Sequence, residues 1–362
     1  MVTIKAGALA DFVRDIFIKA GCSAAEGERI GKYLVGANLA GHDSHGVVRV
    51  PRYLQWKQEG AVVADQKVEI KTETPVLAVV DGVHGFGQTV APQAVQIGID
   101  KCKAMGLSMV ALRNAGHIGR VGDWAEMAAA AGLVSIHFVN ASGSVLVAPF
   151  GGTQRRMSTA PFCAGIPRPG QSPIVLDFAT SVVAEGKVLV ASQGGKKLPD
   201  NALIALDGKM STDPHLLYGE YTATGPRNHT AGPGAIRAFG DHKGSGLALM
   251  CELLGGSLTG MCATGEGQRF GNGMLSIYID PAVVDPEALF PGDVARYLAY
   301  FKSAKPATAG GEVLTPGEPE ERTRRQRLAE GVPLPDDTWA SIVNAAREAG
   351  VDERRIQQVG AN

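Results

Sequence analysis

The beginning of the chain carries a strong helical pattern. Positions three and four apart are apolar in a stretch that Gly21 ends, which is typical of a helix with one buried face. Ser23 and Glu26 have the spacing of a capping box, in which each side chain binds a free backbone N–H group at the start of a helix. That second helix is expected through Ile30–Ala37 and ends at Gly41, which places residues 42–45 at a helix end. The apolar positions of the first helix are Leu9, Phe12, Val13, Ile16 and Phe17.

Short apolar runs then alternate with helical patterns. Strands are predicted from period-two alternation or from continuous apolar runs between turn residues, at 68–70, 76–80, 108–112, 133–139, 173–178 and 274–280. Helices are predicted at 88–104, 122–131, 179–191, 244–259 and 285–302, and a last helix contains Trp339 and Ile342. Strands that alternate with helices indicate an α/β core.

The segment near the C-terminal end changes character. Residues 308–317 are rich in Gly, Pro and Thr and are expected to form a loop. Residues 318–327 form a charge run, in which Glu320/Arg324 and Glu321/Arg325 lie four positions apart. This spacing predicts two ion pairs on the solvated face of a helix.

Composition narrows the class of protein. Charged residues make up 20% of the 362 residues and apolar residues 45%, as in a soluble globular protein. With 35 basic and 36 acidic side chains, the chain lacks the basic excess that binding to nucleic acid or to a membrane surface requires. Apart from four adjacent pairs, the 47 glycines are scattered singly, which indicates tight turns and close approach of the backbone to a ligand.

Targeting and redox signals are weak. The five cysteines lie far apart without a Cys-x-x-Cys pair, so neither a zinc knuckle nor a disulfide framework is indicated. Lys5, Asp11 and Arg14 interrupt the N-terminal pattern, unlike a secretory signal peptide. The most apolar long stretch, 247–261, is short for a membrane span and contains Glu252. We therefore expect a cytoplasmic protein without membrane or nucleic-acid partners.

Residues 41–53 carry the densest candidate chemistry, Gly-His-Asp-Ser-His-Gly-Val-Val-Arg-Val-Pro-Arg-Tyr. His45 can move a proton near neutral pH, and the hydroxyl of Ser44 beside it can orient the ring. Arg49 and Arg52 can each hold a carboxylate through two hydrogen bonds. A proton donor beside a carboxylate clamp indicates chemistry on a small acid. The alternative is a polar helix start whose side chains cap the helix.

Metal and serine chemistry have little support. His42, Asp43 and His45 are close in sequence, but a catalytic zinc needs three placed ligands and a supporting shell. The chain has no His-x-x-x-His or His-Glu-x-x-His pattern. No Gly-x-Ser-x-Gly elbow accompanies the histidines, as a serine nucleophile of that type would need. No metal site is predicted.

A glycine-rich loop follows one predicted strand. Residues 113–123 read Arg-Asn-Ala-Gly-His-Ile-Gly-Arg-Val-Gly-Asp and open onto a predicted helix. Backbone N–H groups at such a helix start can bind an anion, and Arg120 could contact a pyrophosphate. The spacing is neither the Rossmann fingerprint nor a Walker loop, so an ordinary turn is the alternative. His117 is a turn residue, a cofactor contact or a second proton carrier.

Three further segments place polar groups beside apolar elements. Residues 239–246 contain Lys243 among three glycines, a candidate phosphate or ribose ligand or else an exposed loop lysine. Thr180 and Ser181 follow a predicted strand and can cap a helix, bind a cofactor or do both. Residues 158–161, Ser-Thr-Ala-Pro, have the composition of a turn.

Taken together, these motifs resemble those of the type-2 malate/L-lactate dehydrogenase family, and the resemblance spans nearly the whole chain. Each motif is weak alone, but five in the same order are specific. Within the family, the segments 39–46, 135–139 and 147–150 resemble the hydroxycarboxylate dehydrogenase B branch. The motifs are 41–46 with Arg49, Pro51 and Tyr53, 114–119, 177–181 with Gly186 and Lys187, 242–246, and 314–318.

The resemblance implies an α/β fold that is not a Rossmann fold. It implies a discontinuous substrate and dimerisation domain, 1–115 with 286–362, packed on an inserted NAD(P)-binding domain, 116–285. It further implies an enzyme that moves a hydride between NAD or NADP and a small 2-hydroxy or 2-oxo acid, such as malate, lactate or another hydroxycarboxylate. A homodimer or a higher homo-oligomer is expected by the same resemblance.

Residue roles are carried over motif by motif from the family. His45 matches the proton donor and Ser44 its hydrogen-bonding neighbour, while in some relatives the counterpart of His117 takes the catalytic role. Arg49 and Thr159 match substrate contacts, and Arg52 is added as the second arginine of its motif. The expected cofactor contacts are His117, Ile118, Gly119, Arg120, Val121, Ala179, Thr180, Ser181, His242, Lys243, Pro316, Gly317 and Glu318.

Departures from the family pattern leave the substrate open. Ala160 stands where many relatives have Asn, and Ala115 where Ser is common. The family's imine reductase has an Asp near the position of Lys187, so its charge relay is in doubt here. The alternatives are therefore a reductase of cyclic or N-alkyl imino acids, which uses the same hydride geometry, and a non-catalytic ligand-binding relative. Three further questions stay open: whether the cofactor is NAD or NADP, which direction of the reaction is physiological, and whether His45 or His117 is the proton donor.

Overall fold

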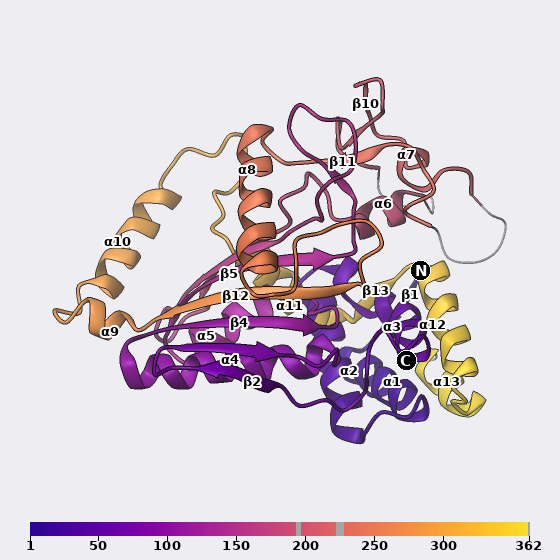
Figure 1. Ribbon diagram of the computed structural model, residues 1–362, viewed down its shortest axis with the longest axis horizontal. Helices are drawn as coiled ribbons and strands as arrows, with labels where there is room; N and C mark the ends of the chain where they lie inside the picture. Colours follow the sequence, from indigo (N-terminus) through magenta and orange to yellow (C-terminus); the bar gives the residue numbers. More distant parts are fainter. Residues whose placement is uncertain (193–196, 222–227, 361–362) are drawn as a thin grey trace.

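The computed structural model describes residues 1–192, 197–221 and 228–360 of the protein. A seven-stranded sheet lies at its centre, with strand order β2-β3-β4-β12-β5-β7-β8 (Figure 1). In this sheet β3 and β4 run parallel, and the other described neighbours are antiparallel. The strands are β2 (Glu69–Glu73), β3 (Leu77–Asp81), β4 (Leu107–Ala115), β5 (Val134–Ser142), β7 (Phe162–Ile166), β8 (Ile174–Phe178) and β12 (Gly271–Ile279).

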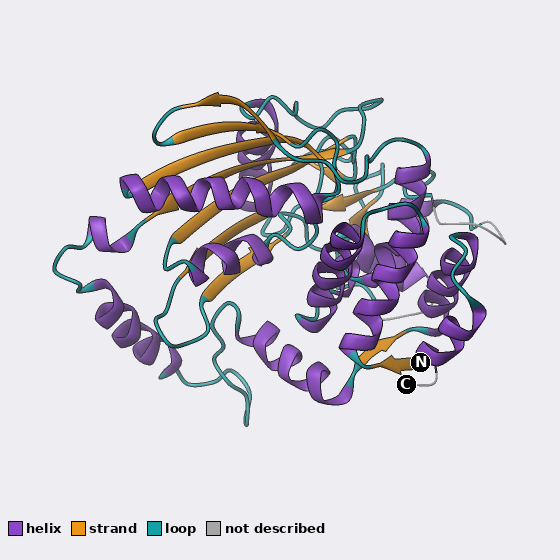
Figure 2. Ribbon diagram, turned by 90° about the horizontal axis from the view of Figure 1, so that it is seen from below, coloured by secondary structure: helices purple, strands orange, loops and turns teal. Residues whose placement is uncertain are grey.

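Helices cover both faces of this sheet (Figure 2). Successive residues of a strand point to opposite faces, and β5 shows the result. Val139 packs in the apolar cluster that includes α4 and α5, whereas Phe138 packs against the cluster that includes α8. The covering elements are α4 (Gly87–Met105), α5 (Gly122–Ala130), α8 (His242–Cys251) and the π-helical turn η3 (Glu252–Ser257).

Both ends of the chain build a helical lobe beside the sheet, called the terminal lobe below. β1 (Val2–Ile4) pairs antiparallel with β13 (Val332–Leu334), and one apolar cluster joins Leu9 and Phe17 to Ile342. Its helices and 3-10 turns are α1 (Ala6–Lys19), α2 (Ala24–Leu39), η1 (Asp43–His45), η2 (Val47–Arg49), α3 (Val50–Gln58), α12 (Asp336–Glu348) and α13 (Glu353–Gly360).

The sheet crosses the domain boundary that was expected at residue 115. β2, β3 and β4 all precede that residue, yet β4 pairs with β12 and so belongs to the central sheet. Residues 69–115 therefore lie with the proposed cofactor domain, 116–285, rather than with the terminal helices. The boundary at residue 115 was implied by the family resemblance, and backbone pairing between distant segments leaves no local sequence signal that could have moved it.

A second, smaller sheet has the strand order β10-β9-β11-β6. Apolar residues from this sheet, including Leu203 and Ile236, form one cluster with Ala248 of α8. The cluster anchors the helix α6, which reaches the functional site described below. The elements are β6 (Val147–Ala148), β9 (Leu203–Ile204), β10 (Met210–Ser211), β11 (Ala235–Arg237), α6 (Glu185–Ser192) and α7 (His215–Tyr218).

After β12 the chain forms an arm, α9 (Pro281–Val284) and α10 (Phe290–Lys302), which stands away from the sheet in both views (Figures 1 and 2). No residue of α10 is buried. The chain then returns through α11 (Glu318–Glu330), which leads into β13. The exposed apolar side chains of the arm are Val283, Val284, Leu289, Tyr297, Tyr300 and Phe301.

Two predicted helices begin later than their patterns indicate. The helix predicted over 179–191 begins at Glu185, because Ser181 bridges Ala238 and the preceding residues are extended. The helix predicted over 285–302 begins at Phe290.

One of the two predicted ion pairs on α11 does not form. Arg325 lies 3.6 Å from Glu321, as the spacing predicts. Glu320 instead contacts His42, and Arg324 contacts Glu126, at 3.2 and 3.1 Å. Both side chains therefore face the body of the protein, so this face of α11 is not the solvated one that the charge run indicated.

Candidate active site

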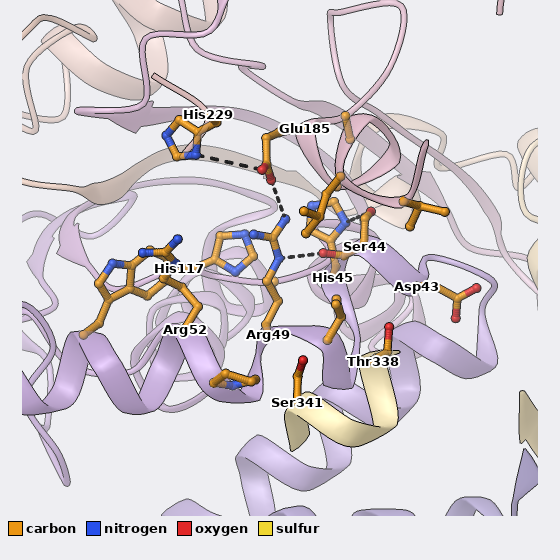
Figure 3. Close-up of a pocket in the computed structure, with 18 of the residues that line it drawn as sticks. Asp43, Ser44, His45, Arg49, Arg52, His117, Glu185, His229, Thr338 and Ser341 are labelled. Carbon is orange, nitrogen blue, oxygen red and sulfur yellow. Dashed lines mark hydrogen bonds and ion pairs between the residues drawn. The ribbon is translucent and has the colours of Figure 1, made fainter. Parts of the chain in front are cut away.

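A cleft of about 1140 Å³ lies between the terminal lobe and the sheet. It is lined by residues of the 42–56 segment, the glycine-rich loop after β4, α6 and α12. Figure 3 shows that the side chains of Ser44, His45, Arg49, His117 and Glu185 gather in one part of this cleft. The structure thus brings together residues that lie far apart in sequence.

Ser44 and His45 lie in the 3-10 turn η1, directly after α2. Arg327 of α11 holds the start of this turn, since its guanidinium donates to both carboxylate oxygens of Asp43 at 2.6 and 3.0 Å. Gly186 lets α6 approach, because a Cβ there would lie 2.5 Å from the Cβ of Ser44. The Oγ of Ser44 lies 3.0 Å from Nδ1 of His45 and can therefore fix the orientation of the ring.

The imidazoles of His45 and His117 stack against each other, with centroids 5.6 Å apart and planes 13° from parallel. Burial, the neighbouring His117 and the charge of Arg49 lower the pKa of His45 well below its usual value. Burial and then Arg49 lower the pKa of His117 to about 3. Both rings are therefore neutral near neutral pH.

Behind His117 lies a short chain of hydrogen bonds. The hydroxyl of Tyr53 is 2.6 Å from Nδ1 of His117, and Nε2 of Gln88 is 3.0 Å from that hydroxyl. The same amide nitrogen is 3.2 Å from the carbonyl oxygen of His117. Tyr53 and Gln88 are both buried, so water does not replace these contacts.

Arg49 faces the cleft with part of its guanidinium already bound. Its Nε donates to the carbonyl oxygen of Ser44 at 2.6 Å, and one terminal nitrogen lies 3.4 Å from a carboxylate oxygen of Glu185. Arg52 lies one helical turn further along the chain and donates to Gln55 at 3.0 Å. A substrate carboxylate at Arg49 would therefore share that side chain with Glu185.

Glu185 is the centre of a polar group that sequence reasoning did not find. Tyr218 donates to it at 2.7 Å, and Nδ1 of His229 lies 3.9 Å from the same oxygen (Figure 3). Burial favours the neutral acid, but the charges of Arg49 and His229 and the bond from Tyr218 outweigh it, so the pKa of Glu185 is lowered. The carboxylate is therefore ionised inside the cleft.

Thr159 lines the same cleft on a loop that other residues hold in place. The hydroxyl of Thr180 donates to the carbonyl oxygens of Thr159 and Ala160, at 3.1 and 2.9 Å. Buried Glu252 of η3 accepts from the backbone and the hydroxyl of Ser158 at 2.8 and 2.6 Å. The hydroxyl of Thr180 is thus bound within the protein.

The segments expected to contact the cofactor meet along β8 and the residues after it. The backbone N–H of Gly122, beside the glycine-rich loop, donates to Asp177 at 2.7 Å. The backbone N–H of Val175 lies 3.4 Å from the carbonyl oxygen of Pro316, and that of Phe239 donates to Thr180 at 3.0 Å. Four segments remote in sequence therefore meet in one strip along β8.

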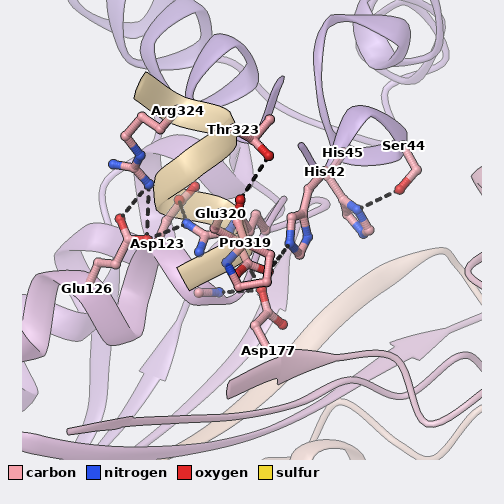
Figure 4. Close-up of polar contacts among 12 residues, drawn as sticks. His42, Ser44, His45, Asp123, Glu126, Asp177, Pro319, Glu320, Thr323 and Arg324 are labelled. Carbon is pink, nitrogen blue, oxygen red and sulfur yellow. Dashed lines mark hydrogen bonds and ion pairs between the residues drawn. The ribbon is translucent and has the colours of Figure 1, made fainter. Parts of the chain in front are cut away.

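Arg120 does not reach outward to an anion as the loop pattern suggested. It is 3% exposed, and its guanidinium lies 2.9 Å from Asp123 and 2.8 Å from Glu126. Figure 4 shows how Glu126 continues to Arg324 of α11. The side chain of Arg120 thus joins α5 to α11 through Glu126.

Among the other expected cofactor residues, some side chains are already bound within the protein and others are exposed to solvent. The hydroxyl of Ser181 donates to the carbonyl oxygen of Val183, and Glu318 accepts from the backbone of Thr315 and pairs with Lys302. His242 and Lys243 lie exposed at the start of α8. Ile118, Gly119 and Val121 line the cleft, whereas Ala179, Pro316 and Gly317 lie outside its lining.

Glu185, Tyr218, His229 and Gln88 carried no sequence signal of their own. Glu185 offered the best chance, because it lies between the 177–181 motif and Gly186. Within residues 1–192, 197–221 and 228–360, no three His, Cys, Asp or Glu side chains are grouped as metal ligands. In the same residues, no helix has the length and apolar character needed to cross a membrane.

Comparison with known proteins places the chain in a family. Residues 4–343 match the malate/L-lactate dehydrogenase family. Hydroxycarboxylate dehydrogenase B of Escherichia coli K12 is 36% identical over 354 residues, 96% of this chain and 95% of that protein. The structure of a putative malate/lactate dehydrogenase from E. coli has a TM-score of 0.92 and 35% identity, over 99% of this chain and 98% of that one.

A more distant structure has the same fold. Malate dehydrogenase from Pyrococcus horikoshii OT3 has a TM-score of 0.84 and 26% identity, over 97% of this chain and 96% of that one. The matched family and the named relatives are dehydrogenases, which supports an oxidoreductase. The chain belongs to the malate/L-lactate dehydrogenase family.

Proposed function

We propose that this protein interconverts a small 2-hydroxy acid and its 2-oxo acid with a nicotinamide cofactor, NAD or NADP. The observation that carries the proposal is the pair of stacked imidazoles, His45 and His117, beside Arg49 in one cleft. Two rings that can donate or accept protons, next to a cation, suit a carbonyl or hydroxyl group attached to a carboxylate.

The roles follow from the geometry. Ser44 contacts Nδ1 of His45, which leaves Nε2 to exchange a proton with the substrate oxygen. Arg49 and Arg52 attract the carboxylate, and Thr159 borders the same space. A nicotinamide ring, when bound, supplies or accepts the hydride. Positioned proton transfer of this kind contributes typically about 10²–10⁴-fold to the rate.

The strip along β8 fits a dinucleotide. Gly119 and Gly317 have φ angles of +71° and +94°, and neither carries a side chain that would block the backbone. Lys243 is exposed and forms no ion pair with any residue that the structure describes, so its charge is available to a phosphate. The start of α8 adds the positive end of a helix dipole.

The proposal is tested by oxidation of NADH and NADPH in the presence of 2-oxo acids and, separately, cyclic imino acids. We expect turnover with a 2-oxo acid, and His45→Asn should lower kcat by roughly two to four decades. Arg49→Lys should mainly raise KM, because lysine keeps the charge but loses the planar fork. His215→Asn, at an exposed histidine of α7, is the matched control.

Three results would contradict the proposal. Turnover only with imino acids would make the protein an imine reductase. No turnover with either class would indicate a non-catalytic relative. Near-normal turnover in His45→Asn would remove that residue from proton transfer.

A further inference from the structure

We propose that Gln88 and Tyr53 are positioning residues that keep the proton of His117 on Nε2, so that His117 donates a hydrogen bond to the substrate oxygen and His45 alone transfers the proton. This inference rests on the proposed function and decides between the two histidines that the sequence left open.

The first step is the orientation of the Gln88 side chain. One atom of its amide lies 3.2 Å from the carbonyl oxygen of His117, which can only accept a hydrogen bond. That atom must therefore be the amide nitrogen. Its second hydrogen then points to the hydroxyl oxygen of Tyr53, 3.0 Å away. Gln88 is fully buried, so its amide has no water to turn toward.

The second step is the direction of the bond between Tyr53 and His117. The hydroxyl oxygen already accepts from Gln88, and its own hydrogen must find an acceptor. Nδ1 of His117 lies 2.6 Å away, a separation typical of an O–H donor and shorter than most bonds from N–H. The other acceptor in reach, the carbonyl oxygen of His117, is 3.4 Å away and already bound to Gln88. Tyr53 therefore donates to Nδ1.

The third step concerns the ring itself. Nδ1 accepts a hydrogen bond and so carries no proton, which leaves the single proton of the neutral imidazole on Nε2. Burial and Arg49 lower the pKa of His117 to about 3, so a second proton is not gained near neutral pH. Since His117 lines the cleft, Nε2–H is the group that it offers to a ligand.

The two histidines then differ in what they can do. If His117 gave up its Nε2 proton, it would become an imidazolate, because Tyr53 supplies no proton that the ring could keep. His45 has only the hydroxyl of Ser44 at Nδ1, and that hydroxyl can rotate to accept from Nδ1–H. His45 can therefore release and regain a proton at Nε2 while Nδ1–H stays bound to Ser44.

The chemical consequence is a division of labour on one oxygen atom. As the 2-oxo acid is reduced, negative charge develops on the carbonyl oxygen, and a fixed N–H donor stabilises it. His45 then forms the new O–H bond. Reduction consumes the hydride and one proton, and the proton comes from His45 alone.

The test is NMR of protein labelled with ¹⁵N in its histidines, which reports on each ring nitrogen directly. The His117 signals are identified by their loss in His117→Gln. We expect a protonated Nε2 and an unprotonated Nδ1 in wild type, unchanged between pH 5 and 8. In Tyr53→Phe and Gln88→Met, a population with the proton on Nδ1 should appear. Tyr278→Phe, at a buried tyrosine of the sheet core, should leave the signals unchanged.

A proton on Nδ1 of His117 in wild type would overturn the inference, as would a ring that titrates within this range. So would Tyr53→Phe and Gln88→Met variants that fold but keep the wild-type tautomer. The NMR result does not depend on turnover, so the two proposals can fail separately. The inference fails if the NMR signals show another tautomer, whereas the proposed function fails if the wild-type protein has no activity.

Kinetics gives a second readout. Removing the donor in His117→Phe should lower kcat by about 10²–10³-fold yet keep the dependence of the rate on pH that His45 imposes. If that pH dependence disappeared in His117→Phe and persisted in His45→Asn, the roles would be reversed and the inference overturned.

Discussion

The positive charge of Arg49 influences how the two stacked histidines of the cleft, His45 and His117, titrate. It lies close enough to lower the pKa of His45 and that of His117, in addition to the larger effect of burial. It also helps to keep Glu185 ionised. One side chain thus holds two neutral rings and one carboxylate in the states that the proposed reaction needs.

The pH dependence of the two directions should differ. Because the pKa of His45 is lowered, the ring is neutral above that pKa and ready to accept the proton of a hydroxy acid. We expect kcat/KM for oxidation to be level near neutral pH and to fall only in acid. For reduction, which needs the protonated ring, kcat/KM should rise as the pH falls toward that pKa.

Steady-state profiles in both directions check this prediction. Arg49→Met provides the contrast, since loss of the cation should move the acid limb of oxidation upward toward the usual imidazole range. The contrary result would be a wild-type profile in which kcat/KM for oxidation already falls at or above the usual pKa of imidazole. It would show that His45 is not the group that titrates.

Glu185 should set the charge that the cleft accepts. Its carboxylate lies 3.4 Å from Arg49 and opposes a second negative charge on the substrate. Glu185→Gln should therefore lower KM for a dicarboxylic 2-oxo acid by about three- to tenfold, with less effect on a monocarboxylic one. Glu348→Gln, at an exposed carboxylate that lines the same cleft, is the control. Equal changes for both substrate classes would refute a role in charge selection.

At this scale the sequence located the motif residues but not their partners. His45, Ser44 and Arg49 share one short segment, so their proximity follows from local chain geometry. Gln88 and Glu185 lie in other helices, and only tertiary packing brings them to His117 and Arg49. For Arg120 the sequence indicated a partner that the structure does not show. Its glycine-rich setting indicated an anion site, but nearby acids on α5 bind its side chain.

Among the elements, α11 connects the 3-10 turn η1 to the helix α5. Arg327 binds Asp43 at the start of η1. Arg324 binds Glu126 of α5 (Figure 4). His42 adds a contact to Glu320 on the same helix. Since η1 carries Ser44 and His45, the position of α11 affects the geometry of the active site.

Arg327→Gln should therefore affect both stability and activity. Loss of the paired bonds to half-exposed Asp43 should lower the free energy of unfolding by about 1–2 kcal/mol. The loosened η1 turn should also lower kcat. Arg325→Gln removes an exposed pair on the same helix and should cost less than about 0.5 kcal/mol. Chemical denaturation and kinetics measure both, and equal behaviour of the two variants would argue against a special role for Arg327.

Long periodic elements were predictable, whereas very short ones were not. The helix over Leu9–Phe17 and the buried strand through Val139 have enough residues to show a period. β6, β9 and β10 have two residues each, too few for any alternation to be visible. On α11 the i,i+4 spacing of Glu320 and Arg324 was correct, but half-buried partners on other elements replaced the local pair.

For the whole molecule, we expect the arm of α9 and α10 to pack against a second copy. An amphipathic helix without buried residues leaves apolar surface in water, which monomeric proteins rarely tolerate over a contiguous area. A second exposed apolar set lies on the outer side of α8 and η3: Leu249, Met250, Leu253 and Leu258. Both sets favour a homodimer.

We expect analytical ultracentrifugation to show a dimer at micromolar concentration. The double variant Tyr297→Glu/Tyr300→Glu should shift it toward monomer, since charges would be buried at the contact. Leu206→Glu, at an exposed apolar residue in the turn between β9 and β10, should remain dimeric. A wild-type monomer with full activity would contradict this assignment of the arm.

The pairing of β1 with β13 has a consequence for how the protein is made. Translation proceeds at roughly 5–20 residues per second, so tens of seconds separate the appearance of the two strands on the ribosome. During that time α1 and α2 have emerged without the C-terminal residues that complete their apolar cluster. The nascent chain must therefore carry an unfinished lobe, a natural client for chaperones, while the sheet forms behind it. Neither Arg327 nor α12 is present to order the cleft until synthesis is almost over, so the growing chain stays inactive until that late stage.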